Sequence, residues 1–316
     1  MMTVIFSSHN GERTLPRMFE ALCHMEKPEG GWKLIAVDNA STDRTQQIMT
    51  EWRDRLPMEI MFHGRKGKSA ALNVALERAE GELVVLTDDD IIPCSSWLKA
   101  LYITAQRQPD YDLFGGSIEP VWPYPPPDWL LKYVPLGISY AMTKPARTEG
   151  PMEATLIWGP NMMFRAEVFQ NGHRFLESIG PIAGESYIMG QETEFTSRLD
   201  AIGHRAWFVP EARVGHIVRP EQMQRDWILS RAVRFGKTLA FKESELLQRD
   251  GIPFVLGAPR WMYRALVIHW LHSLVAGSPF KTGRSIASAW QVYMLWGRIG
   301  QHRALQRKMY AQDTSK

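Results

Sequence analysis

Three consecutive carboxylates follow an apolar run in the segment VVLTDDDIIP, and of all the residues in this sequence they point most directly to chemistry. Residues 84–86 have the composition of a buried strand, and Asp88, Asp89 and Asp90 stand at its carboxyl end. Adjacent carboxylates repel one another and resist burial, so a cation or several hydrogen-bond donors must compensate them. Carboxylates at positions i and i+2 suit a hard divalent cation that also binds phosphate oxygens. The alternative is a solvated turn, with Asp90 near the cap of a following helix.

Strands and helices alternate through the first third of the chain. Apolar runs at 3–8, 32–41 and 58–63, and the run ending at the aspartates, predict four strands with helices between them. This spacing favours parallel pairing with crossover helices that cover the sheet. In such sheets, ligands bind at the carboxyl ends of the strands. The strands therefore bring one set of polar residues to a single sheet edge: Ser7, Ser8, Asp38, residues 63–68 and the three aspartates.

The middle and the end of the chain depart from this pattern. The segment 119–135 is rich in proline and aromatic residues, so we expect a surface loop there rather than a helix or a central strand. A helix is expected for GQETEFTSRLDAIG, followed by two short strands, HRAWFVP and ARVGHIV. From about residue 220 the pattern is helical. We therefore expect an α/β domain over residues 1–220 and a helical region over 221–316.

Composition excludes several classes of protein. The 316 residues carry a formal net charge of +3, which is too small to indicate a nucleic-acid partner. Cys23 and Cys94 fit no metal-ligand spacing. The N-terminal MMTVIFSSHN enters a strand without the features of a signal peptide, and no stretch of about 20 residues lacks charges. We therefore expect a cytoplasmic protein.

The C-terminal helices mix Trp, Leu, Met and Tyr with Arg, Lys and His. This composition suits helices that lie in a membrane interface, with aromatic and basic side chains at the level of the lipid headgroups. The protein would then be peripheral on the inner face of the plasma membrane. Packing of the helices on the main domain and dimerisation through them are alternatives, and the oligomeric state stays open.

The order of the polar motifs resembles that of the family 2 glycosyltransferases, which have the GT-A nucleotide-sugar fold. The resemblance runs from about residue 3 to 220, through VIFSSHNGERTLPRMFEAL, LIAVDNASTDRTQQIM, GKSAALNVALERAEGELVVLTDDD, GPNMMFRAEVF, GQETEFTSRLDAIG and VGHIV. It implies a Rossmann-like mixed sheet flanked by helices, with a C-terminal helical appendage. It also implies inverting transfer of a sugar from a nucleotide-diphospho-sugar to a glycan or lipid-linked acceptor in bacterial-type polysaccharide or glycolipid synthesis. A UDP-sugar is the first candidate for the donor.

The resemblance further implies roles for individual residues. Asp38 is expected at the nucleobase, Asp88 at the ribose, and Asp90 at a Mn²⁺ or Mg²⁺ ion and the diphosphate. His216 is expected at the metal or phosphate. The catalytic base falls on Glu192 in GQETEF, where glutamate replaces the commoner aspartate and Gln191 replaces an acid; Glu194 is a rival. The remaining residues expected to bind the donor are Ser7, Lys68, Asp89, Trp158 and Asn161.

Other functions fit parts of the pattern. The segment GRKGKSAALN is no P-loop, because Phe62 stands where that motif needs a glycine. An aspartate-nucleophile phosphotransferase needs a downstream lysine and a second acidic pair that have no clear place here. A non-catalytic, membrane-associated module that keeps the fold is a further alternative. The joint presence of the implied nucleotide, metal and base residues argues against it.

Overall fold

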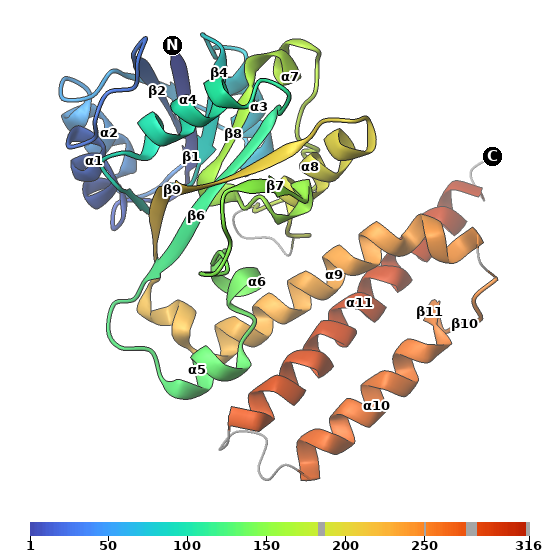
Figure 1. Ribbon diagram of the computed structural model, residues 1–316. Coiled ribbons are helices and arrows are strands. Elements are labelled where there is room, and N and C mark those ends of the chain that lie inside the picture. Colours follow the sequence, from blue (N-terminus) through green and yellow to red (C-terminus); the bar gives the residue numbers. More distant parts are fainter. Residues whose placement is uncertain (183–186, 250, 276–282, 314–316) are drawn as a thin grey trace. The chain divides into compact units, whose positions relative to one another are not determined.

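A computed structural model describes residues 1–182, 187–249, 251–275 and 283–313 (Figure 1). The chain divides into two compact units. Unit 1 comprises Met1–Val121, Tyr140–Glu185 and Gly190–Ile217, and unit 2 comprises Trp122–Ser139, Ser186–Met189 and Val218–Lys316. The boundary expected after residue 220 lies close to the break after Ile217. Two internal segments also group with unit 2, which the sequence did not indicate.

A mixed sheet forms the centre of unit 1. Four parallel strands make one half of it, in the order β3 (Met58–Phe62), β2 (Trp32–Asp38), β1 (Met2–Ser8) and β4 (Leu83–Thr87). The other half contains β8 (Met162–Arg165), β6 (Leu113–Val121), β9 (Ala206–Ile217) and β5 (Ile91–Pro93), with β7 (Gly150–Met152) also paired to β9. β8 runs antiparallel to β4 and β6. The predicted α/β class, with four parallel strands, is confirmed.

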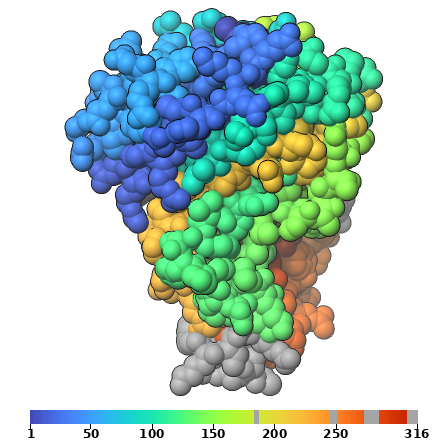
Figure 2. All heavy atoms as spheres, turned by 60° about the vertical axis from the view of Figure 1, so that its left-hand side comes forward, coloured from blue at the N-terminus to red at the C-terminus, as the bar shows by residue number. Residues whose placement is uncertain are grey.

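Helices cover both faces of this sheet. One face carries α1 (Leu15–Cys23), α2 (Thr45–Trp52) and α4 (Trp97–Arg107), and the other α3 (Lys68–Leu76), α7 (Ala166–Gln170) and α8 (Gln191–Ala201). Because both faces are covered, β1 and β4 are buried along their whole length. Figure 2 shows the surface residues of the N-terminal part of this unit, blue to cyan, gathered over one region of the molecule.

Two expectations from the sequence were wrong. The proline-rich segment contains regular structure, because β6 extends to Val121 and α5 (Asp128–Tyr133) begins directly after Pro127, followed by α6 (Leu136–Tyr140). Proline lacks an amide hydrogen, which does not matter at a helix start. The two short strands expected near the end of unit 1 are one strand, β9, whose pairing with β6 shifts register between Gly116 and Ser117. Such a shift bends a strand without ending it.

Unit 2 is built on three long helices, as the sequence predicted. They are α9 (Arg225–Arg249), α10 (Arg260–Val275) and α11 (Gly283–Asp313), and α11 packs on both α9 and α10 (Figure 1). Glycine allows the close approach of α9 and α11. A Cβ atom added at Gly236 would lie 1.9 Å from the Met294 carbonyl oxygen, and one at Gly297 would lie 2.1 Å from that of Val233.

Hydrogen bonds from α9 explain why the two internal segments belong to unit 2. Arg231 Nε donates to the Ile138 carbonyl at 3.2 Å. Arg234 donates to the Tyr187 hydroxyl at 3.1 Å, and Thr238 Oγ1 donates to the Met189 carbonyl at 2.6 Å.

Candidate active site

The three aspartates lie in the turn from β4 to β5, and their side chains alternate in direction. The pairing of β5 with β9 sets Ile91 opposite His216, so the histidine lies beside the turn. His216 Nε2 is 3.2 Å from Asp90 Oδ1, and one ligand atom each from Asp88, Asp90 and His216 lie within 4.8 Å of one another. Asp89 instead accepts a hydrogen bond from Ser8 Oγ at the end of β1. The structure thus joins three of the predicted site residues in what we call the acidic cluster: Asp88, Asp90 and His216.

The acidic cluster suits a divalent cation. Two carboxylates and one imidazole are hard to borderline ligands of the kind that Mn²⁺ accepts. His216 Nδ1 donates to the Tyr140 carbonyl at 2.8 Å, which directs Nε2 to the cluster. Burial lowers the pKa of His216, but the charge of Asp90 and a hydrogen bond to it outweigh burial and raise this pKa to about 9. A divalent cation bound at Nε2 would displace that proton, so two positive charges would replace one beside the two carboxylates.

Asp89 has a different environment from its neighbours. Burial raises its pKa, the charge of Asp90 raises it further, and the hydrogen bond from Ser8 acts in the opposite direction. A Cβ atom at Gly11 would lie 2.8 Å from Asp89 Oδ2, so the N-terminal loop closes tightly over this carboxyl group. Ser7, the residue expected at the donor, is buried on the opposite face of β1 from Ser8. Ser8 was missed as a supporting residue because the sequence does not tell which serine faces the aspartates.

Lys68 connects the acidic cluster with the predicted base. It is the first residue of α3, and its ammonium group donates to Asp88 and lies 3.4 Å from Glu192 Oε1. Burial lowers the pKa of Lys68, but the charges of Asp88 and Glu192 raise it more, so the pKa stands above its ordinary value. The ammonium group therefore stays protonated and bridges the two carboxylates.

The first turn of α8 separates the two candidate bases. Glu192 points toward Lys68 and keeps 19% of its side chain exposed. Glu194 is bound by the guanidinium of Arg198, at 2.5 Å from Nε to Oε1 and 3.2 Å from Nη2 to Oε2. A carboxylate held in this way has both oxygens engaged. The geometry therefore favours Glu192 over Glu194.

Gly159 limits the space around Glu192. It lies in the short turn before β8, and a Cβ atom there would be 2.6 Å from Glu192 Oε1 and 3.0 Å from its carboxyl carbon. The absence of a side chain at this position therefore lets the carboxylate occupy its place beside Lys68. GPN was part of the motif that the sequence analysis identified, but the role of its glycine depends on a contact with α8 that no local pattern encodes.

Asp38 and Asn39 stand at the end of β2, where ligand contacts were expected. Asp38 is buried, and its Oδ1 accepts a hydrogen bond from the Ser41 amide at 3.0 Å. The Asn39 side chain donates to the carbonyls of His63 at 3.1 Å and Arg65 at 2.7 Å, and its Oδ1 accepts from the Gly67 amide at 2.9 Å. Asn39, also missed from the sequence, thereby fixes the loop that leads to Lys68.

Asn161 supports the sheet. It is fully buried, and its Nδ2 donates to the carbonyls of Ser117 at 3.0 Å and Ala212 at 2.7 Å. Its Oδ1 accepts from Trp97 Nε1 at 2.9 Å. Because both amide hydrogens and the carbonyl oxygen are engaged inside unit 1, we give Asn161 a supporting role instead of the expected contact with a donor. Trp158 is half-buried and packs against the core beneath α1, α2 and α4.

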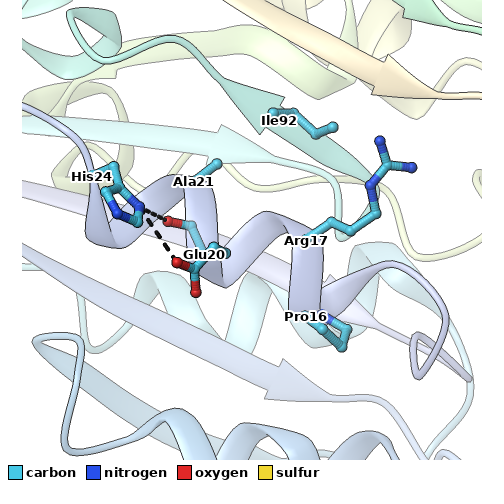
Figure 3. Close-up of a pocket in the computed structure, with 6 residues that line it drawn as sticks. All are labelled: Pro16, Arg17, Glu20, Ala21, His24 and Ile92. Atoms are coloured by element: carbon cyan, nitrogen blue, oxygen red, sulfur yellow. Dashed lines mark hydrogen bonds and ion pairs between the residues drawn. The ribbon is translucent and has the colours of Figure 1, made fainter.

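A separate depression of about 530 Å³ lies along α1 (Figure 3). Its lining residues are Pro16, Arg17, Glu20, Ala21, His24 and Ile92. In it, His24 Nδ1 donates to the Glu20 carbonyl at 2.7 Å. The depression shares no lining residue with the acidic cluster, Lys68 or Glu192, and so is distinct from the candidate site.

Comparison with known proteins decides the family. The sequence model described as "Glycosyl transferase family 2" matches residues 3–172, which is more than half of the chain. The chain belongs to glycosyl transferase family 2. The predicted resemblance is confirmed.

Among curated relatives, the poly(ribitol-phosphate) beta-N-acetylglucosaminyltransferase TarS of Staphylococcus aureus is 31% identical over 90 residues, which are 28% of this chain and 16% of TarS. The glucosyl-dolichyl phosphate glucuronosyltransferase of Haloferax volcanii is 23% identical over 211 residues, which are 63% of this chain and 64% of that protein. The matches therefore span less than two thirds of either relative.

Solved structures of glycosyltransferases share the fold. The mannosyltransferase PcManGT from Pyrobaculum calidifontis, solved with GDP-Man and Mn²⁺, has a TM-score of 0.62 at 19% identity, over 95% of this chain and 86% of that one. TarS residues 1–349 with UDP have a TM-score of 0.55 at 17% identity, over 97% of this chain and 91% of that one. The expected GT-A fold is thereby confirmed.

Proposed function

We propose that this protein is a metal-dependent, inverting glycosyltransferase that transfers a sugar from a nucleotide-diphospho-sugar, a UDP-sugar first, to a glycan or lipid-linked acceptor. The observation that carries the proposal is the acidic cluster, joined through Lys68 to Glu192. The proposal is supported by neighbours of the same fold that were solved with UDP or with GDP-Man and Mn²⁺. The pathway we infer is bacterial-type polysaccharide or glycolipid synthesis.

Each residue on the donor side of the proposed site is assigned a role in binding the nucleotide sugar. Asp90 and His216 would hold a Mn²⁺ or Mg²⁺ ion, with Asp88 beside them at the ribose. The bound cation supplies charge neutralisation for the leaving diphosphate. Asp38 binds the nucleobase at the end of β2, Asp89 braces the turn through Ser8, and Trp158 borders the sugar pocket.

Glu192 acts as the general base. It takes the proton of the acceptor hydroxyl while that oxygen forms a bond to C1 of the sugar and the bond from C1 to the diphosphate breaks. Attack from the face opposite the leaving group inverts the configuration at C1. Lys68 holds the carboxylate in position through the ion pair at 3.4 Å. The pairing of Lys68 with Glu192 supports an enzyme over the alternative of a non-catalytic module.

Gly159→Ala is expected to lower kcat about 100-fold, because the added methyl group would push the Glu192 carboxylate about 1 Å from its place. The clash involves the end of a side chain that can move, so we expect the melting temperature to change little. Steady-state release of nucleoside diphosphate, with thermal unfolding of the same sample, measures both quantities. An unchanged kcat would show that Gly159 does not position the base.

The experiment that tests the proposed function is thermal unfolding with UDP, GDP and CDP, each with and without Mn²⁺. A nucleotide at 100 times its dissociation constant adds about 2.7 kcal/mol to the free energy of unfolding. We expect a rise of a few degrees with one nucleotide, dependent on the metal. The absence of a shift with every nucleotide would contradict the proposal.

We also propose that the protein is a peripheral protein on the cytoplasmic face of the plasma membrane. No helix within the described ranges combines the length and the apolar character needed to cross a bilayer. The mixture of aromatic and basic residues in the helices of unit 2 supports this attachment.

A further inference from the structure

Among the residues that the structure describes, one side of α10 carries large apolar side chains that are partly exposed. Met262 is fully buried in a cluster with Leu295 and Ile299 of α11. Large apolar side chains elsewhere on α10 are between 41% and 53% exposed: Trp261, Val267, Ile268, Trp270 and Leu271. At 100° per residue they fall within one half of the helix circumference, with Trp261 and Trp270 at its two edges, together with the exposed Arg264. We call these six residues the outer face of α10.

The outer face of α10 differs from the rest of the surface because its exposed apolar side chains are clustered. Single exposed apolar side chains are normal on a protein surface, as with Phe62 at 65% and Ile202 at 62% in unit 1. Five large apolar side chains gathered on 16 residues of helix form a patch. Patches of this kind mark surfaces that bind a membrane or another macromolecule.

The charge of the chain segment that carries this face selects the partner. The sequence has no Asp or Glu from residue 251 to residue 312. It has eight basic residues there: Arg260, Arg264, Lys281, Arg284, Arg298, Arg303, Arg307 and Lys308.

Arg298 is occupied within unit 2. It pairs with Glu243 at 3.0 Å from Nε to Oε2 and lies over the Trp261 ring at 4.7 Å. Arg260, Arg264, Arg303 and Arg307 are exposed. A second copy of the same chain would bring like charges together, which disfavours a dimer through this face. A negatively charged surface complements it.

We propose that the outer face of α10 docks on a bilayer that contains anionic phospholipids. The apolar side chains enter the boundary between headgroups and acyl chains, and Arg260 and Arg264 contact headgroup phosphates. A helix of 16 residues is about 24 Å long, shorter than the bilayer core of about 30 Å, and fits along the surface. This inference rests on the membrane attachment in the proposed function and is independent of sugar transfer.

The test is co-sedimentation of the full chain with vesicles, without nucleotide or metal. Vesicles of phosphatidylcholine alone are compared with vesicles that also contain phosphatidylglycerol. We expect binding to the anionic vesicles. Each basic residue at the surface contributes about a fivefold change in partitioning, so Arg260→Gln with Arg264→Gln should weaken binding about 30-fold. Val267→Ser with Leu271→Ser should weaken it at least tenfold. The matched control, Phe62→Ser with Ile202→Ser, should bind as the wild type does.

Three outcomes would overturn the inference. They are no binding of the wild type to anionic vesicles, equal binding to both kinds of vesicle, and unchanged binding of both α10 variants. A dimer in lipid-free solution that Val267→Ser with Leu271→Ser converts to monomer, without vesicle binding, would assign the face to a second copy. Circular dichroism of each variant establishes that its helices are formed. Failure here leaves the nucleotide-dependent shift untouched, so the two proposals fail separately.

Discussion

Glu192→Gln is expected to lower kcat about 1000-fold with little change in KM for the donor. A positioned general base contributes about 100- to 10,000-fold, and glutamine keeps the shape of the side chain but cannot take a proton. The amide still fits against Gly159 and still lies near Lys68, so the fold and the donor site should persist. Steady-state kinetics of nucleoside diphosphate release, with the melting temperature, separates lost chemistry from lost structure.

Glu194→Gln is the matched control for this prediction. It lies in the same turn of α8, but its carboxylate is bound by Arg198. We expect kcat within about threefold of the wild type, because Arg198 already engages both oxygens of this carboxylate. The stability should also change little, because an ion pair that is partly exposed contributes on the order of 1 kcal/mol or less to the free energy of unfolding. A large loss in Glu194→Gln with normal turnover in Glu192→Gln would reverse the assignment of the base.

Asp90→Asn is expected to abolish the metal-dependent thermal shift and to lower kcat/KM about 1000-fold or more. The substitution removes a charged ligand from the acidic cluster, and metal-assisted charge stabilisation is worth several kcal/mol, of which about 4 kcal/mol corresponds to 1000-fold. Next to burial, the charge of Asp90 raises the pKa of Asp89, so removing that charge relieves the repulsion between the two carboxylates. The same substitution also removes the ion pair between Asp90 and His216, which destabilises the fold. Because these effects oppose each other, the metal-free variant should melt close to the wild type.

A similar carboxylate–histidine pair provides the control. Asp112 Oδ2 lies 2.8 Å from His204 Nδ1, away from the acidic cluster. Asp112→Asn should keep both the metal-dependent shift and the activity. The measurements are activity against Mn²⁺ concentration and melting temperature with and without nucleotide. Retention of the metal-dependent shift in Asp90→Asn would remove Asp90 from the metal site.

Local patterns in the sequence were sufficient for the parallel half of the sheet. β1, β2 and β4 are apolar runs that end in polar residues, and buried parallel strands have this composition because helices cover both faces. β3, at the edge of the sheet, is only partly buried but still alternates with the helices along the chain. Asp38 and the three aspartates could therefore be placed at strand ends from the sequence alone. The long helices of unit 2 were likewise predictable.

The directions of side chains and the partners of distant segments were decided only by the tertiary structure. The pairing of β5 with β9 sets His216 beside Asp90, and residues so far apart in the chain share no local pattern. Arg198 binds the carboxylate of Glu194, whereas the carboxylate of Glu192 points toward Lys68. Ser8, and not Ser7, faces Asp89. Sequence periodicity determines which residues share a face, but not which other element that face will meet. Composition alone determined which residue types this protein has for the proposed nucleotide-sugar site, and long-range packing decided which of them come together, because those contacts close loops of many residues.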